Sequence, residues 1–198
     1  MTVSISKPGQ FVEPDQIKEV LDLLREQAKI PMALIGGVAL KWFGCPRIPG
    51  NVDVGALFEV NLSPLSSSPL RYGGTQWERE GEPPVRVLVR KDEYAMLFQN
   101  AIMSAIPGPE GFPTVTPEYL AAMKFIVPPR EFEMDSVVHR LDLKWLLGRP
   151  GLVSREKLWQ IVYDQVGGRF AKDMLRVLDG EVQLDIEMDP NRDRSSYP

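Results

Sequence analysis

The sequence is poor in the side chains that build disulfides and zinc sites. It contains one cysteine, Cys45, and one histidine, His139. A single cysteine excludes an intramolecular disulfide framework, and the two residues together are too few for a zinc cluster of cysteines and histidines. A metal ion bound by this chain would therefore be a hard cation held by oxygen ligands.

Long apolar stretches are also missing. No run approaches the roughly 18 residues of a membrane span. The first residues, MTVSISKPGQFVEPDQ, have neither the basic nor the apolar region of a signal peptide. We therefore expect a soluble, cytoplasmic protein with no membrane partner.

Charge and proline content further limit the kinds of protein that this sequence can encode. Lys plus Arg is 23 and Asp plus Glu is 27, for a net charge of −4. This balance argues against a surface devoted wholly to nucleic acid, although a local basic groove is compatible with it. Proline accounts for 18 of the 198 residues, well above the usual level of about 5%, and should break the chain into short elements joined by rigid turns.

Helix and strand patterns alternate over the first two thirds of the chain. Amphipathic stripes predict helices, short apolar runs predict strands, and clusters of Gly and Pro separate them. Residues 61–83 are rich in Ser, Pro and Gly and are predicted to form an irregular insertion. The predicted elements are a helix over 13–29, a strand over 32–35, a helix over 38–43, strands over 51–58 and 85–89, and helices over 93–103 and 116–127.

The last third is predicted to be helical, over 134–147, 154–166 and 169–178. The expected fold class is therefore α/β (α+β), a small mixed β-sheet flanked by helices and followed by a helical C-terminal lobe. The expected organisation is an N-terminal tail over 1–12, an α/β domain over 13–127, a helical lobe over 128–188 packed on it, and a polar, disordered tail over 189–198.

One stretch of the α/β part combines residues that suit phosphate and metal chemistry. Gly36 and Gly37 follow the strand at 32–35 and open a short helix, where backbone N–H groups can approach a phosphate closely. Asn51 and Asp53 lie two residues apart on the next strand, so their side chains share a face. Oxygen ligands beside a phosphate cradle are the arrangement that holds Mg²⁺ against a triphosphate.

These motifs resemble those of the nucleotidyltransferase superfamily, with its DNA polymerase beta-like fold. The first match is Ile35-Gly36-Gly37, then Arg47, then Asn51-Val52-Asp53-Val54. A second match lies downstream, in Pro117-Glu118-Tyr119-Leu120 with Lys124 and then Leu141-Asp142-Leu143. The resemblance implies that Asp53 and Asn51 hold Mg²⁺ as the catalytic pair. It also implies that Gly36, Gly37, Arg47 and Lys124 bind the phosphates of a nucleoside triphosphate.

The chain departs from the family pattern at its carboxylates. Asn51 stands where the family has its first acid, and Arg86 stands on the strand that carries the third acid. Asp92 and Glu93 follow that strand and would take the third position if its register shifted. A two-metal site needs two or three carboxylates to balance the divalent charges, and Asp53 is the one secure member here.

Two functions are compatible with a site that has one secure carboxylate. One is a nucleotidyltransferase-like protein, with weakened or absent catalysis, that binds a nucleoside triphosphate or a nucleic-acid-related ligand; if active, it would modify a hydroxyl of RNA, protein or a small molecule. The other is a non-catalytic interaction or regulatory module, antitoxin-like or a pseudoenzyme, that acts on a protein partner. Arg47 and Lys124 also have structural alternatives, since Arg47 can close a turn or pair with Asp53 and Lys124 can pair with Asp142.

Overall fold

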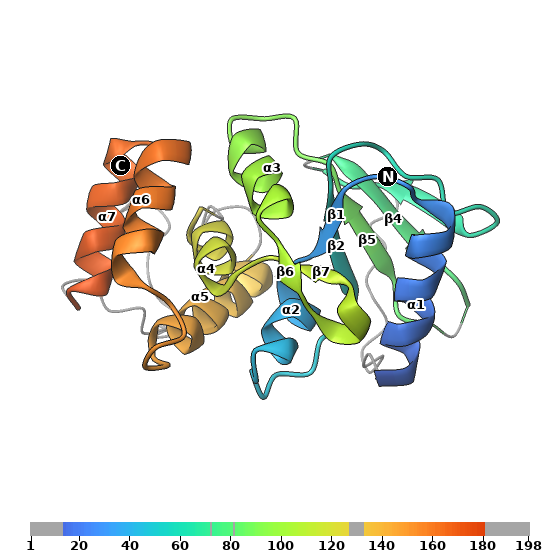
Figure 1. Cartoon of the computed structure of the whole chain (residues 1–198), viewed down its shortest axis with the longest axis horizontal. Helices are drawn as coiled ribbons and strands as arrows, with labels where there is room; N and C mark the ends of the chain where they lie inside the picture. The colour runs from blue at the N-terminus through green and yellow to red at the C-terminus, as the bar shows by residue number, and fades with distance from the viewer. Residues whose placement is uncertain (1–13, 72, 81, 127–132, 181–198) are drawn as a thin grey trace.

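The structure is a computed structural model that describes residues 14–71, 73–80, 82–126 and 133–180 (Figure 1). The predicted tails over 1–12 and 189–198 lie outside these residues, as does the predicted boundary at 127/128. None of the helices in the described ranges is both long and apolar enough to cross a bilayer.

A mixed sheet forms the middle of the molecule. Among the described residues it has seven strands, in the order β3-β4-β5-β2-β1-β7-β6. At its centre β2 runs antiparallel to β1 and parallel to β5, and β7 joins β1 in parallel on the other side. The strands are β1 Met32–Leu34, β2 Val52–Ala56, β3 Ser66–Pro69, β4 Gly74–Glu78, β5 Val85–Leu88, β6 Ile106–Pro107 and β7 Pro113–Thr114.

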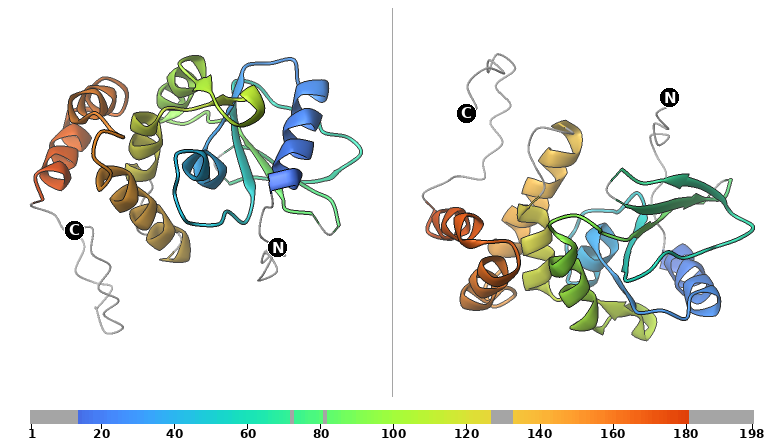
Figure 2. Two further views of the ribbon diagram at one scale, coloured as in Figure 1. Left: turned by 60° about the horizontal axis from the view of Figure 1, so that its bottom comes forward. Right: turned by 90° about the horizontal axis from the view of Figure 1, so that it is seen from above.

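Helices cover the sheet and extend the molecule at one end. They are α1 Pro14–Gln27, α2 Gly36–Trp42, α3 Ala95–Met103, α4 Pro117–Phe125, α5 Glu133–Leu147, α6 Arg155–Gln165 and α7 Gly168–Leu178. Figure 2 shows α1 at the opposite end of the molecule from α6 and α7, with the sheet between them. The α/β class predicted from the sequence is therefore confirmed.

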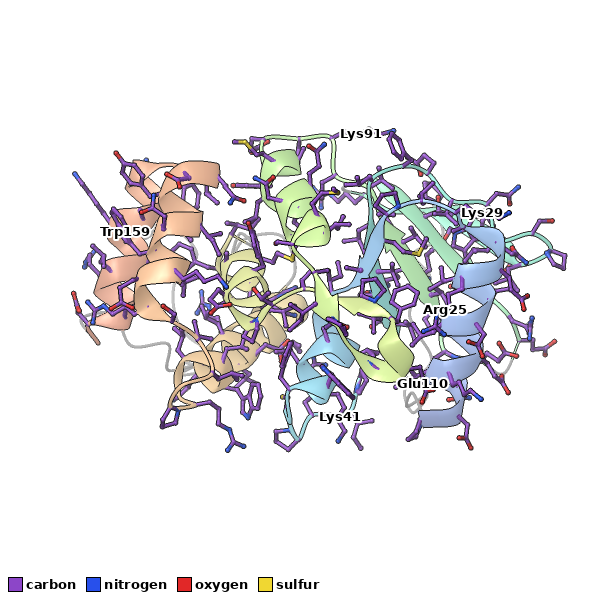
Figure 3. All side chains as sticks on the ribbon, in the orientation of Figure 1. Arg25, Lys29, Lys41, Lys91, Glu110 and Trp159 are labelled. Carbon is purple, nitrogen blue, oxygen red and sulfur yellow. The ribbon has the colours of Figure 1, made fainter. Side chains whose placement is uncertain are left out.

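The first helix is held against the sheet by its apolar stripe. Val20, Leu21 and Leu24 are buried, at the spacing that brings side chains onto one face of a helix. Near the helix end, Arg25 donates a hydrogen bond of 2.5 Å to the carbonyl of Glu110 in the short 3₁₀ turn Pro109–Gly111 (Figure 3). This contact joins α1 to the connection between β6 and β7.

The segment over 61–83, predicted to be irregular, contains two strands. Residues 66–69 and 74–78 form β3 and β4, an antiparallel hairpin that extends the sheet beyond β5. The strand pattern is absent from the sequence because all four residues of β3 are exposed and polar or proline. The hairpin is anchored through β4, whose Trp77 is buried.

A second unpredicted pairing lies in the Pro- and Gly-rich break over 107–113. There β6 and β7 form a minimal hairpin, and β7 pairs in parallel with β1 through Leu34 and Thr114. A strand of two residues has no periodicity that a sequence could reveal. The pairing matters for the site because the chain passes directly from β7 into α4.

The fourth helix lies between the sheet and the C-terminal helices. Every residue from Pro117 to Lys124 is buried, because α4 packs against α2 and α3 on one side and against α5 and α6 on the other. A helix buried all round is a core element, so the helical part over 133–178 shares its core with the α/β part. Ser154 is the N-cap of α6, since its Oγ accepts a hydrogen bond from the backbone N–H of Lys157 at 3.3 Å.

Candidate functional site

The Gly-Gly turn after β1 is built around the carboxylate of Asp53. Gly36 is the first residue of α2 and has a φ of +63°, in the left-handed region where a Cβ is strained. A Cβ at this position would also overlap Oδ2 of Asp53. The residue is therefore glycine for two reasons, its backbone conformation and the carboxylate that lies against it.

Asn51 and Asp53 meet as their spacing predicts, but they bind each other. The Nδ2 of Asn51 donates a hydrogen bond to Oδ1 of Asp53. Asn51 precedes β2 and Asp53 is its second residue, and both side chains are half-buried. An amide that donates to the carboxylate occupies one of the lone pairs that a metal ion would need.

The third position of the predicted metal site is filled by a cation. Asp53 on β2 is the register partner of Arg86 on β5, and Arg86 is the register partner of Gln76 on β4. Paired residues of neighbouring strands project from the same face of a sheet. The Nε of Arg86 donates to Oε1 of Gln76 at 2.8 Å. A row of carboxylate, guanidinium and amide therefore crosses three strands.

The two acids that follow β5 are used elsewhere. Asp92 accepts two hydrogen bonds from Arg90, through Nε at 3.0 Å and through Nη2, and a third from the backbone N–H of Tyr94 at 3.3 Å. Glu93 and Asp92 also act on the phenol of Tyr94, whose pKa is raised by burial and then by these two negative charges. Arg86, rather than Asp92 or Glu93, is the residue beside Asp53.

A second cluster lies on the helical side of the site. Arg47, in the loop between α2 and β2, makes a two-pronged ion pair with Asp142 of α5, through Nε at 2.8 Å and Nη2 at 2.9 Å. Lys124 of α4 contacts the same carboxylate at 2.8 Å. The side chains of Asp142 and Lys124 are only 1% and 7% exposed, whereas that of Arg47 is 32% exposed. Lys124 thus pairs with Asp142, as one of its sequence alternatives predicted.

Gly37 connects the two clusters. A Cβ at this residue would lie 2.9 Å from Cβ of Pro49 and 3.1 Å from Nη2 of Arg47. The absence of a side chain therefore lets the loop that carries Arg47 close over the start of α2. Both glycines of the predicted cradle are in place, one against Asp53 and the other against Arg47.

The charges of the two clusters act on one another. Burial raises the pKa of the Asp53 carboxyl, against the opposing effect of the positive charges of Arg86, Lys124 and Arg47, in that order, and of the Asn51 hydrogen bond. The charges of three cations thus act on Asp53, and two of these cations are bound to Asp142. The site is cationic in sum, with three positive groups against two carboxylates.

His139 is the part of the site that the sequence did not reveal. It lies one turn before Asp142 on α5, and burial, together with the nearby charge of Lys124, lowers its pKa to about 4. Its Nδ1 is buried without a hydrogen-bond partner. The imidazole is therefore neutral at physiological pH. The spacing of three residues from Asp142 was the signal that could have placed it here.

The donor set does not suit the magnesium ion that the resemblance implies. In the described ranges no three His, Cys, Asp or Glu residues lie together as a metal-binding group. Asp53 is the one carboxylate at the predicted centre, Asn51 donates to it, and Arg86 places a positive charge beside it. Hard divalent cations are held by several negatively charged oxygens, so these residues favour an anion over a metal ion.

Comparison with solved structures finds several similar chains. No family model matches the sequence, and no curated protein matches it. A solution structure of the antibiotic-resistance factor ANT(2″)-Ia, an aminoglycoside nucleotidyltransferase, is similar with 13% identity and a TM-score of 0.46, over 85% of this chain and 91% of that chain. At this identity and TM-score the likeness assigns neither a substrate nor a reaction to this chain.

Proposed function

We propose that this chain is a nucleotidyltransferase-like protein that binds a nucleoside triphosphate, or a nucleic-acid-related ligand, with catalysis weakened or absent. The observation that carries the proposal is a cluster of three cations near the Gly36 turn: Arg86 is the register partner of Asp53, and Arg47 and Lys124 bind Asp142 close enough for their charges to act on Asp53. These residues come from β5, α4, a loop, β2 and α2, so the whole fold contributes to one place.

Binding of phosphates is what this charge arrangement supports. Arginine and lysine side chains recognise phosphate oxygens by charge-assisted hydrogen bonds. These hydrogen bonds are strongest where water is partly excluded. Arg86 and Arg47 are both half-buried, so a ligand can reach them while their surroundings stay partly dry. Gln76 holds Arg86, and Asp142 holds Arg47 and Lys124, before a ligand arrives.

Weak catalysis follows from the carboxylates. In-line transfer of a nucleoside monophosphate to a hydroxyl relies on metal ions to neutralise the charge that develops on the phosphate oxygens. With Asp53 alone, and hydrogen-bonded to Asn51, the site offers little to hold such ions. Arg86, Lys124 and Arg47 offset part of the phosphate charge but supply no activated nucleophile.

The second candidate is a non-catalytic interaction or regulatory module with a protein partner. It is favoured by the hydrogen bond between Asn51 and Asp53, because a pair that satisfies itself needs no ligand. This candidate differs from the first in one respect that can be measured. It predicts that no nucleotide stabilises the protein.

Thermal unfolding with ligand separates the two candidates. The full chain is heated with each of the four nucleoside triphosphates, with and without Mg²⁺ or Mn²⁺, beside Arg86→Gln and the control Arg79→Gln. Arg79 is 53% exposed and pairs with Glu82 in the connection between β4 and β5. A ligand at a hundred times its Kd stabilises a protein by about 2.7 kcal/mol, which is several degrees in Tm.

We expect this stabilisation in the wild type and in Arg79→Gln, and its loss in Arg86→Gln. Absence of any shift in the wild type, in every nucleotide and metal condition, would sink the proposal and leave the interaction module. A shift that Arg86→Gln retains in full would place the ligand elsewhere on the protein.

A further inference from the structure

The mismatch between the donor set and a metal ion has a consequence for the ligand. We infer that the site takes the polyphosphate part of its ligand as a bare anion, without a divalent cation, and that the guanidinium of Arg86 supplies the positive charge that a metal ion would otherwise supply. This inference rests on the proposed function. It goes further in naming the form of the ligand and the residue that replaces the cofactor.

The position of Arg86 carries the first step. It is the register partner of Asp53 on the neighbouring parallel strand, so the two side chains leave the same face of the sheet side by side. Of the three cations that act on the Asp53 carboxyl, Arg86 has the largest effect. A cation fixed beside the one carboxylate of the site occupies the neighbourhood in which a divalent ion would have to sit.

The second step is that Arg86 is oriented before any ligand binds. Its Nε donates to Oε1 of Gln76 at 2.8 Å, and Gln76 lies on β4, on the side of Arg86 away from Asp53. A guanidinium has five N–H donors in a planar fork, so one bond to Gln76 leaves others for phosphate oxygens. Since Gln76 is neutral, the full positive charge remains for the ligand and for Asp53.

The third step is the charge balance. The site has three cations, Arg86, Arg47 and Lys124, against the carboxylates of Asp53 and Asp142. A site of several carboxylates repels a triphosphate unless metal ions stand between them, whereas a site with excess positive charge attracts the free anion directly. Mg²⁺ bound to the triphosphate reduces the charge that these cations recognise.

Isothermal titration calorimetry on the full chain tests the inference. ATP, GTP, CTP, UTP and inorganic tripolyphosphate are titrated once with EDTA and once with excess Mg²⁺. We expect binding in EDTA that is as tight as with Mg²⁺ or tighter, and a loss of about tenfold or more in Arg86→Gln, as for a charge-assisted hydrogen bond. The control Arg79→Gln keeps the wild-type affinity. Tripolyphosphate bound as tightly as a nucleotide assigns recognition to the phosphates alone, and weaker binding assigns part of it to the nucleoside.

A variant with additional carboxylates tests the converse, that acids at these positions create a metal site. Asn51→Asp with Arg86→Asp gives the site three acids, and this double variant should bind Mn²⁺ directly, measured by electron paramagnetic resonance without nucleotide, while the wild type does not. It should also need a divalent cation to bind a triphosphate. Circular dichroism checks that the variant folds, and the wild-type titrations in EDTA decide the question without it.

The outcomes separate the inference from the proposed function. Triphosphate binding that requires Mg²⁺ would overturn the inference and leave the proposed function intact. Unchanged affinity of Arg86→Gln in EDTA would overturn the role given to this residue. Absence of binding both in EDTA and with Mg²⁺ would overturn the inference and the proposed function together.

Discussion

Two carboxylates of this protein share the same cations but are held in opposite ways. Asp142, on α5, is bound on both oxygens by Arg47 and Lys124 and is 1% exposed. Asp53, on β2, accepts a hydrogen bond from a neutral amide and lies against the backbone of Gly36, half-buried at the edge of the cluster. The acid on the helix is fully matched with opposite charge, and the acid on the sheet is not.

The difference separates scaffold from site. An ion pair with all its partners in place fixes the geometry of the elements it joins, here the α2–β2 loop, α4 and α5. A carboxylate that is desolvated and has no direct ionic partner destabilises the folded state, so a role in function explains its presence better than a role in stability. Removal of each acid should therefore have a different effect on the free energy of unfolding.

Asp142→Asn should produce the largest loss of stability. The substitution leaves Lys124, 7% exposed, and Arg47 without their counter-charge, and breaking a buried pair in this way costs about 3–5 kcal/mol. Urea denaturation at pH 7, monitored by tryptophan fluorescence, measures it. Asp22→Asn is the matched control, since Asp22 is 50% exposed and pairs with Arg25 at the surface, where the cost is about 0–1 kcal/mol. Equal losses in the two variants would remove the distinction between scaffold and site.

Gly36→Ala should cost about 2–3 kcal/mol. The left-handed conformation accounts for about 1–2 kcal/mol, and the overlap of the new Cβ with the Asp53 carboxylate adds to it. Gly44→Ala is the control, because Gly44 has a φ of +94° but no atom near the position of its Cβ. The difference between the two variants in chemical denaturation isolates the contact with Asp53. If the two variants are equally destabilised, the carboxylate of Asp53 moves away from the new Cβ and its position is not fixed by this turn.

His139 should make the protein sensitive to mild acid. Burial and the charge of Lys124, with a smaller effect of Arg47, outweigh the attraction of Asp142 and lower its pKa from 6.5 to about 4. The folded state therefore resists protonation that the unfolded state accepts, so this stability is present above pH 6.5 and is lost as the pH falls toward 4. The loss is on the order of 2 kcal/mol.

The histidine is the sole one of the chain, so its contribution can be isolated. Stability curves of the wild type and His139→Gln between pH 7 and 5 should diverge, with the wild type falling more steeply. Parallel curves would mean that the imidazole is not part of the cationic cluster. The divergence would also sharpen the contrast between the acids, because His139 lies with Asp142 on α5 rather than with Asp53.

Much of the fold could be predicted because its main helices and strands have apolar residues at the spacing expected for their buried faces. The stripe of α1, the apolar runs of β1, β2 and β5, and the helices of the last third all follow from it. The β3–β4 hairpin and the β6–β7 pair could not, since an exposed polar edge and a two-residue strand leave no pattern. The contacts that define them come from the rest of the sheet.

The sequence identified the residues of the candidate site but not the hydrogen bonds and ion pairs among them. The spacing of Asn51 and Asp53 places them on one face, and Gly36, Arg47 and Lys124 belong to recognisable sequence motifs. That Arg47 and Lys124 converge on one carboxylate 18 residues beyond Lys124 depends on how α4 and α5 pack, which no local pattern contains. The same packing brings His139 to the cluster.

Asp53→Asn should have the smallest effect on stability, and it tests the comparison most directly. The pKa of Asp53 is raised, so its contribution to stability is fully present below the unfolded value near 3.8 and is lost as the pH rises through the folded value. Ionisation of the Asp53 carboxyl is therefore a burden to the fold. Asparagine removes that burden and can still accept the hydrogen bond from Asn51. The free energy of unfolding at pH 7 should lie between unchanged and about 1 kcal/mol higher, and the gain should vanish near pH 3. A loss of more than about 2 kcal/mol would mean that Asp53, like Asp142, is an anchor of the scaffold.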